Sequence, residues 1–261
     1  TMSGTQFLCG SIAGYEVGAC LGRALMTADL ARLYRPTGIV GAPAAVMAMA
    51  NATALEPAET VDAFSLAVNA VAGLNQWPHT GGSEMYFHPG FAARNAVLAF
   101  DLARAGALAS SNILEGEAGL FTAYARRTLD EPIVLFADPE PEIMAVFTKE
   151  VPACNFAQTP CQAALMAVAD VPADAIITGV EIFVTRAAER YPGCNAFGPF
   201  DLALQAKMSI PFGVAATLAR REIAETNYAR LNDPDIRRLM ACTELIVDPD
   251  LTVAFPARQG A

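Results

Sequence analysis

The chain has 261 residues, of which 54% are hydrophobic and only 17% are charged, and its formal net charge is −10. This length is enough for one large or two small domains with a substantial buried core. The acidic balance argues against partners such as nucleic acid or anionic membranes. An anionic substrate would therefore need a local cluster of Arg or Lys.

Residues 1–129 are predicted to form an all-helical domain. "YRPTGIVG" at 34–41 is expected to be a loop, with Pro43 in the first turn of the helix that follows. Helices are predicted over the following ranges: 5–25, 43–51, 55–74, 91–105 and, after a turn, the end of 110–125. Because these helices are apolar and carry few charged residues, most of their surfaces are expected to be shielded from solvent.

Residues 130–261 are predicted to form an α+β domain, which makes the fold class mainly α with a smaller α+β part. The segment 130–142 is acidic and rich in proline, as in a linker or a turn at a domain edge. A helix is expected after Thr159 as N-cap, and another after Asp233. The remaining predicted elements are a strand within 176–188, a helix at 205–223 and a strand at 251–257.

Both histidines of the chain lie in one stretch, "HTGGSEMYFHPGFAARN" at 79–95. Its glycines and prolines predict a loop that leads into a helix at Phe91. His88 would then lie just before a helix N-terminus, where unpaired N–H groups and the helix dipole favour anions. His79 opens the same stretch.

The six cysteines are scattered and form no CxxC pair. They are expected to be thiols of a reducing compartment, which places the protein in the cytoplasm. Cys154 and Cys161 lack histidines to complete a zinc site, so no metal is predicted. The uncharged runs at 36–55 and 63–83 are interrupted by Pro or Asn, and are expected to be buried helices rather than membrane spans.

Five segments, in order along the chain, together resemble the MmgE/PrpD family of 2-methylcitrate-dehydratase-like proteins. The segments are "AGYEVGACLGRAL" (13–25), "YRPTGIVGAPAAVMAMANATAL" (34–55), "HPGFAARNAVLAFDLARAGALASSNILEGEAGLFTAY" (88–124), "KEVPACNFAQTPCQAAL" (149–165) and "QAKMSIPFGVAATL" (205–218). The resemblance implies a helical domain followed by an α+β domain. It also implies a lyase or isomerase that moves a proton beside a carboxylate of a small di- or tricarboxylate, without a cofactor.

The resemblance also implies a set of site residues. His88 and Lys149 are the expected catalytic residues, and Arg35, Arg94 and Lys207 the expected substrate-binding residues. Each has a structural alternative. His88 would bond to backbone at a tight turn, Arg35 and Arg94 would pair with carboxylates of the protein, Lys149 would be solvated, and Lys207 would only support the fold. His79 has no counterpart in the family pattern.

Three departures from the family pattern favour an alternative function. Arg35 replaces the histidine of the usual G-F-H-P-T motif, Met85 replaces a lysine, and Phe212 replaces a tyrosine. The family also has an N-terminal helical stretch ahead of the "GYE" helix, and this sequence begins just before that helix. The alternative is a shortened, inactive member that persists as a folded or dimerising protein. A homodimer is expected in either case, because 36–83 is so poor in charge.

Overall fold

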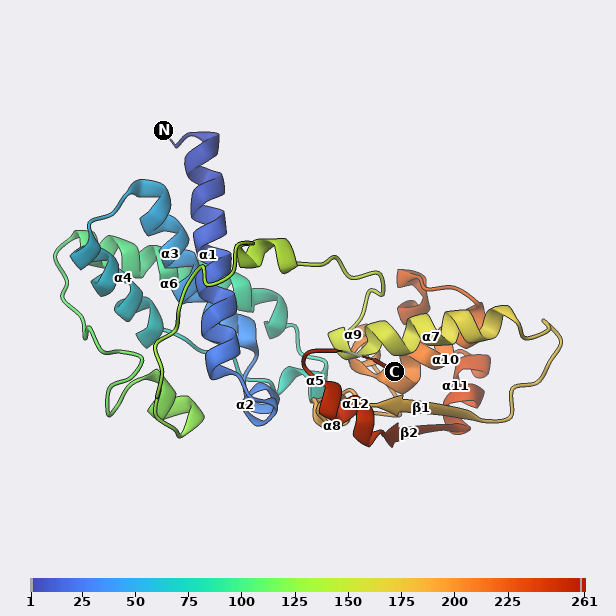
Figure 1. Cartoon of the computed structure of the whole chain (residues 1–261). Coiled ribbons are helices and arrows are strands. Elements are labelled where there is room, and N and C mark those ends of the chain that lie inside the picture. The colour runs from blue at the N-terminus through green and yellow to red at the C-terminus, as the bar shows by residue number, and fades with distance from the viewer. Residues whose placement is uncertain (1, 259) are drawn as a thin grey trace. The chain divides into compact units, whose positions relative to one another are not determined.

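A computed structural model describes residues 2–258 and 260–261 and divides the chain into two compact units (Figure 1). The first unit comprises Thr1–Asn75 and Glu84–Phe147, and the second comprises Gln76–Ser83 and Thr148–Ala261. The acidic segment 130–142 thus belongs to the first unit. The two histidines fall in different units, because His79 lies within 76–83 and His88 does not.

The regular elements described in the first unit are helical, apart from one isolated antiparallel bridge between Tyr34 and Leu74. Its elements are α1 (Gly4–Leu25), α2 (Ala28–Leu33), α3 (Pro36–Thr53), α4 (Pro57–Asn69), α6 (Glu84–Arg104), a π-helical turn η1 (Phe121–Ala125) and a 3-10 turn η2 (Glu142–Ala145). Helix α3 is central, because it packs against α1, α4 and α6.

Small residues allow these helices to approach closely. Glycines recur every fourth residue on α1, and a Cβ atom on Gly10 would lie only 2.6 Å from the carbonyl oxygen of Ala48 on α3. On its other side, α3 contributes Ala42 and Val46 to a core shared with α4 and α6. The remaining buried members of that core are Ala63, Ala67, Ala92, Ala96, Ala99, Phe100 and Ala103. Alanine residues therefore form much of the contact between these helices, because the size of the side chains at a contact sets the distance between the helix axes.

Two helices of this unit begin earlier than the sequence predicts. The loop predicted at 34–41 is wrong, because α3 starts at Pro36, where a proline needs no N–H donor. The helix predicted from Phe91 starts at Glu84 and runs through Pro89. His88 therefore lies inside a helix and not in a loop.

The second unit contains helices and one small sheet. Its elements are α5 (Trp77–Thr80), η3 (Asn155–Ala157), α7 (Gln158–Ala169), β1 (Val180–Val184), α8 (Arg186–Arg190), α9 (Ala203–Met208), α10 (Ile210–Arg220), η4 (Glu225–Ala229), α11 (Pro234–Ala241), β2 (Thr243–Val247) and α12 (Pro249–Ala254). Helix α10 is central here, since it packs against α7, α9 and α11.

The two strands pair in parallel, with Val180 opposite Thr243 and Val184 opposite Val247. The alternation predicted for β1 is confirmed, because Ile182 and Val184 are buried and Phe183 is exposed. Together with the helical first unit, this small sheet confirms the predicted fold class.

Several details of the second unit differ from the prediction. The strand predicted at 251–257 is wrong, because Asp248 caps α12 by accepting from the backbone N–H of Leu251 at 2.8 Å. The true partner strand β2 was missed. The helix predicted at 205–223 is interrupted at Ser209, whose hydroxyl caps α10. Thr159 is not an N-cap, since α7 already begins at Gln158.

Among the helices described at 2–258, none combines the length and the apolar character that crossing a lipid bilayer requires.

Candidate functional site

Helix α6 contains a proline that leaves one carbonyl without its helical donor. Pro89 has no backbone N–H, so it cannot bond to the carbonyl of Met85 four residues earlier. Nη1 of Arg35 donates to the Met85 carbonyl instead. The Arg35 side chain thereby replaces the missing helical hydrogen bond and ties the first turn of α6 to the start of α3.

The backbone just before and within the start of α3 runs against residues 72–75. The N–H of Arg35 donates to the Gly73 carbonyl at 2.9 Å, and the N–H of Ala72 donates to the Gly38 carbonyl at 3.2 Å. A Cβ atom on Gly38 would lie 1.9 Å from the Ala72 carbonyl oxygen, so a larger residue does not fit. A Cβ atom on Gly73 would lie 3.6 Å from Nδ1 of His88. The contact between the start of α3 and residues 72–75 therefore places both Arg35 and His88 beside Gly73.

The imidazole of His88 is held in a buried and positively charged environment. His88 is 6% exposed, and its Nδ1 has no hydrogen-bond partner among the residues described. Burial lowers the pKa of His88, the charge of Arg35 lowers it further, and the charge of Glu84 opposes both. His88 is therefore neutral at pH 7. A buried polar atom without a partner costs about 1–3 kcal/mol.

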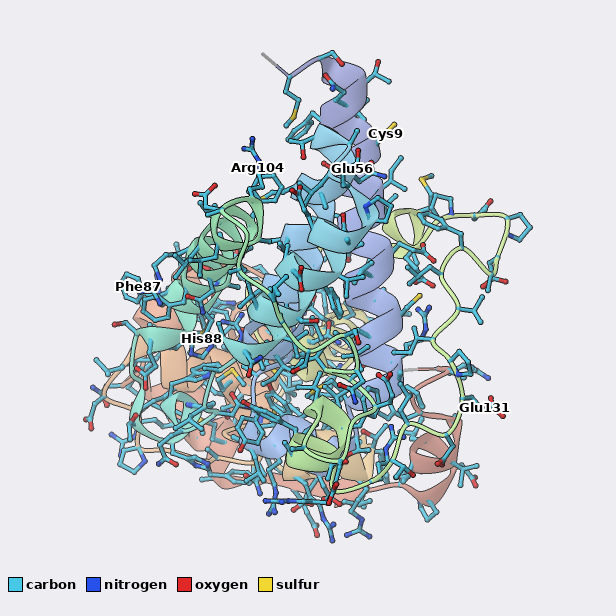
Figure 2. All side chains as sticks on the ribbon, turned by 90° about the vertical axis from the view of Figure 1, so that its left-hand side faces the viewer. Cys9, Glu56, Phe87, His88, Arg104 and Glu131 are labelled. Atoms are coloured by element: carbon cyan, nitrogen blue, oxygen red, sulfur yellow. The ribbon has the colours of Figure 1, made fainter. Side chains whose placement is uncertain are left out.

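Arg94 points away from this environment. It is exposed in the third turn of α6, so the dipole argument for a first-turn anion site does not apply. Its guanidinium carbon lies 5.5 Å from the centre of the Phe91 ring, and Nη2 donates to Oδ1 of Asn95 at 3.0 Å. In the view of Figure 2, Phe87 lies at the periphery while His88 lies among the helices. Within the first unit, Arg35 is thus the predicted site residue that accompanies His88.

The two predicted lysines belong to the second unit. Lys149 is exposed, and its Nζ donates to the Ala153 carbonyl at 3.3 Å. Lys207 forms an ion pair with Glu225, and its Nζ lies 5.8 Å from the centre of the Tyr228 ring. The charge of Lys207 is therefore compensated within its own unit.

His79 and Phe212, which were compared with the family pattern, also lie in the second unit. His79 is exposed on α5. Phe212 is 0% exposed and packs edge-on against Phe200 and obliquely against Tyr228. Where the family pattern has a tyrosine, this chain therefore has a core aromatic residue.

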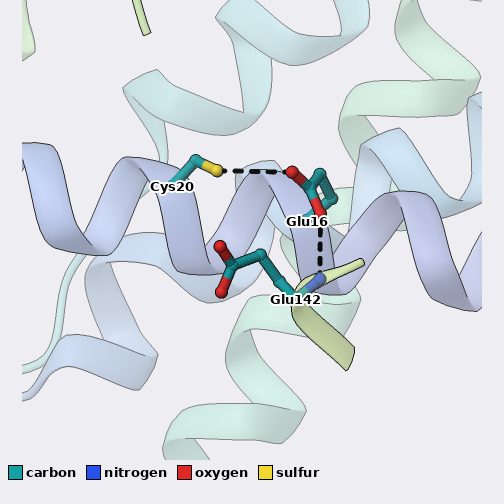
Figure 3. A group of neighbouring side chains, drawn as sticks. All are labelled: Glu16, Cys20 and Glu142. Carbon is teal, nitrogen blue, oxygen red and sulfur yellow. Dashed lines mark hydrogen bonds between the residues drawn. The ribbon is translucent and has the colours of Figure 1, made fainter. Parts of the chain in front are cut away.

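A buried glutamate on α1 organises the end of the first unit (Figure 3). Glu16 on α1 is 3% exposed. Its Oε1 accepts from the backbone N–H of Phe136 at 2.5 Å and from the Cys20 thiol at 3.6 Å, and its Oε2 accepts from the backbone N–H of Glu142 at 3.0 Å. The backbone bonds from Glu142 and Phe136 lower the pKa of Glu16. The carboxylate thus holds the segment around η2 against α1.

The same cluster has the composition of a metal site. One ligand atom from each of Glu16, Cys20 and Glu142 lies within 4.8 Å of the others. However, the Glu16 oxygens already accept backbone bonds, and the Glu142 carboxylate pairs with Arg23. A metal would have to displace these donors. The cluster is therefore better explained as a set of hydrogen bonds and an ion pair that stabilises the fold.

Replacing Glu16 with glutamine is expected to lower the melting temperature of the protein. The amide NH₂ would face a backbone N–H, so one of the Phe136 and Glu142 donors loses its acceptor. Because the pKa of Glu16 is lowered, its stabilising contribution is present at neutral pH and is lost as the carboxylate is protonated in acid. Glu16→Gln should therefore also flatten the loss of stability below pH ~4.5.

Hydrogen exchange at the amides of Phe136 and Glu142 checks this prediction directly, because both should exchange faster in Glu16→Gln. The exposed Glu117 provides the matched control, and Glu117→Gln should leave both amides unchanged. Equal protection in the two variants would contradict the assigned role of Glu16.

Two cavities of the first unit lie away from His88. One holds about 280 Å³ and is lined mainly by apolar residues, among them Leu21, Phe64 and Ile113, with no Lys or Arg among its lining residues. The other holds about 560 Å³ and is lined by Arg23, Arg127 and acidic residues. The apolar cavity does not suit a polycarboxylate, and neither cavity is lined by a predicted site residue.

Family models match most of the chain, and curated relatives match a little under half of it. The family model of the MmgE/PrpD N-terminal domain matches residues 1–131, and that of the MmgE/PrpD C-terminal domain matches residues 151–261. Cis-aconitate decarboxylase from Aspergillus terreus is 34% identical over 122 residues, which make up 46% of this chain and 25% of that protein. A cis-aconitate decarboxylase-like protein from Aspergillus oryzae is 31% identical over 121 residues, with the same two shares.

The matched part of the chain spans about a quarter of the length of these curated relatives. The two family models, by contrast, together account for all but the segment 132–150. On this basis, and with a helical unit followed by a unit containing a small sheet, the chain belongs to the MmgE/PrpD family.

Proposed function

We propose that this chain is a lyase or isomerase that moves a proton at a carbon beside a carboxylate of a small di- or tricarboxylate. The observation that carries this proposal is the buried, neutral His88 next to Arg35 in a protein of net charge −10. Such a reaction needs a base for the proton and positive charge for the enolate-like intermediate. His88 and Arg35 have these two properties.

The proposed mechanism begins with His88 as the base. Its lowered pKa keeps the imidazole unprotonated at neutral pH, so it is ready to accept a proton. The guanidinium of Arg35 binds a substrate carboxylate and stabilises the negative charge that develops on it. No metal or organic cofactor is assigned a part, as the family resemblance implies.

The remaining predicted residues have secondary roles in this proposal. Lys149 acts as a second catalytic group, since it is exposed and bonded only weakly to its own loop among the contacts described. Lys207 binds substrate only if a carboxylate takes the place of Glu225. Arg94 is the weakest member, because it lies on the exposed side of α6. We also propose a cytoplasmic location, which suits six free thiols.

A second function is favoured by a specific observation. One N–H of Arg35 is already used by the Met85 carbonyl, where it repairs the break at Pro89. In this alternative the role of Arg35 is structural, and the chain is a catalytically inactive member of the family. This alternative retains the fold and an interaction surface but no turnover.

Assays of the purified chain on 2-methylcitrate, cis-aconitate and iminodisuccinate separate these two functions. Low turnover of one of them, together with binding measured by calorimetry, is expected for the enzyme. Binding without turnover supports the inactive alternative. Neither binding nor turnover with any of the three would reject the carboxylate function altogether.

We further propose that the chain forms a homodimer through an exposed apolar stripe on α6. Phe87, Phe91, Leu98 and Leu102 recur with helical spacing and are 56%, 48%, 57% and 41% exposed. Contiguous apolar surface of this kind marks interfaces. A species larger than the monomer is therefore expected in light scattering.

Charge introduced into the stripe tests this assignment. Leu98→Glu combined with Leu102→Glu is expected to shift the protein to monomer, because two carboxylates would be buried at the interface. Met166→Glu is the matched control, since Met166 is an exposed apolar residue of the second unit. A monomeric parent across a wide concentration range would overturn the proposal.

A further inference from the structure

Two cysteines of the second unit that are distant in sequence lie side by side. The sulfur atoms of Cys154 and Cys194 are 3.6 Å apart, although the residues are separated by 40 positions. Both are free thiols. Cys194 is 0% exposed, whereas Cys154 is only partly buried. Cys154 is therefore the more accessible residue of the pair.

The two loops that carry these thiols are anchored to the same segment. The N–H of Cys154 donates to the Lys207 carbonyl at 2.9 Å, and the N–H of Ile210 donates to the Cys194 carbonyl at 3.0 Å. Both contacts are with the junction of α9 and α10. The Gln158 side chain adds a bond from Nε2 to the Cys154 carbonyl at 3.2 Å. These hydrogen bonds thus hold the two sulfur atoms close together within the second unit.

The environments of the two thiols differ in a way that assigns each a role. The hydrogen bond from the Cys194 thiol lowers the pKa of Cys154, and the N–H of Phe156 and the charge of Lys149 act in the same direction against the effect of burial. The pKa of Cys194 is raised, first by its bond to Cys154 and then by burial. The thiolate is the nucleophile in cysteine chemistry, so Cys154 is the thiol that reacts first.

We propose that Cys154 and Cys194 form a reversible intramolecular disulfide, with Cys154 as the thiol that reacts with a hydroperoxide and Cys194 as the thiol that resolves it. This site is independent of the proposed function, because none of its steps uses His88 or a carboxylate substrate. Partly exposed, low-pKa thiols with a resolving cysteine beside them are the usual redox-sensitive sites.

The chemistry balances with hydrogen peroxide as the oxidant. The Cys154 thiolate attacks one peroxide oxygen, the O–O bond breaks, and the departing hydroxide takes a proton to become water. Cys154 is then a sulfenic acid. The Cys194 sulfur attacks the Cys154 sulfur, the S–O bond breaks, and the second hydroxide leaves as water with the Cys194 proton. Two thiols and one peroxide thus give one disulfide and two waters.

The geometry requires little movement. A disulfide has a sulfur–sulfur distance of ~2.05 Å, so the two sulfurs must approach by roughly 1.5 Å. Rotation about the Cα–Cβ bonds supplies part of this distance. A small shift of the loop between Lys149 and η3, which carries Cys154, must supply the rest.

Peptide mapping tests the proposal in a Cys9→Ser background, which removes an exposed thiol. The native protein is treated with hydrogen peroxide, blocked with N-ethylmaleimide and digested with trypsin without reduction. The expected product joins peptide 150–186 to peptide 191–207 with the loss of two hydrogen atoms. Dithiothreitol should restore both separate peptides. Fragmentation between Cys154 and Cys161 is needed, because both lie in the first peptide.

Cys161 is the matched control for this assignment. It is 0% exposed, and burial raises its pKa to about 12. Cys161→Ser should keep the crosslink, whereas Cys194→Ser should lose it and leave a Cys154 sulfenic acid that dimedone traps. The parent protein alone decides the matter if a variant fails to fold. A crosslink through Cys161, or sulfenic acid on Cys154 with Cys194 still blocked by maleimide at every dose, would overturn the proposal.

Discussion

Replacement of His88 with alanine is expected to lower kcat/KM by ~10²–10⁴-fold on whichever polycarboxylate the chain turns over, which is the usual contribution of a positioned acid or base. His88 is the one histidine of the first unit, and its ring is held against Gly73 with Nδ1 lacking a partner among the residues described. Removal of the ring takes away the proposed base but leaves Arg35 bonded to Met85. Substrate affinity should therefore fall much less than kcat.

His79→Ala is the matched control, since His79 is the other histidine, is exposed and lies in the second unit. It should retain the parental kcat/KM. Circular dichroism of both variants confirms that the fold is intact. If His88→Ala were to keep parental turnover, His88 would be a core residue and the base would have to be sought elsewhere.

The pH profile of the same reaction provides a second readout. The base must be neutral, so kcat/KM falls as pH decreases through the pKa of His88. Burial and Arg35 lower that pKa, so the acid limb should lie below pH ~6.5. Arg35→Gln should move the limb upward, because it removes a positive charge. Glu84→Gln should move it downward, because it removes the charge that favours protonation.

The sequence predicts the parts of this protein that depend on local patterns. The helical first part, the alternating faces of β1 and the capping of α11 by Asp233 all follow from residues close together in the chain. The resemblance to the MmgE/PrpD family rests on five such segments, and the family models match the same chain. These three features and the family resemblance were therefore assigned correctly.

Long-range contacts explain what the sequence analysis missed. Pro89 predicted a helix break, but Arg35, more than fifty positions earlier, supplies the missing donor and allows α6 to continue. The role of Glu16 depends on backbone groups 120 and 126 residues away. The neighbour of Cys154 is Cys194, not Cys161, which is closer in the sequence. In each case the partner is set by packing, on which local periodicity has no bearing.

The early start of α6 also changes the argument for the site. A loop at 79–90 would have placed His88 at a helix N-terminus, where anions bind to free N–H groups. Inside α6, His88 instead depends on its own burial and on Arg35 for its chemistry. His88 remains the proposed base, but the reason has moved from the helix dipole to the desolvation of a side chain.

Replacement of Gly38 with alanine is expected to destabilise the first unit by about 3 kcal/mol, at the upper end of the usual cost of overpacking. The new Cβ would lie 1.9 Å from the Ala72 carbonyl oxygen and 2.9 Å from Cα of Gly73. Both of these atoms belong to backbone, so no side-chain rotation relieves the clash. The start of α3 and residues 72–75 must move apart, which breaks the hydrogen bond from Ala72 to Gly38.

Gly90 on α6 is the matched control, because a Cβ atom there meets nothing within 4 Å. Gly90→Ala should stabilise the protein by ~0.5–1 kcal/mol, since alanine loses less backbone entropy in a helix. Urea unfolding of both variants, compared at equal m-value, measures the difference.

The same displacement in Gly38→Ala moves Arg35 and Gly73 relative to His88, so polycarboxylate binding should weaken under conditions where the variant is still folded. A stable Gly38→Ala with unchanged binding would show that the crossing of α3 with residues 72–75 does not position the site.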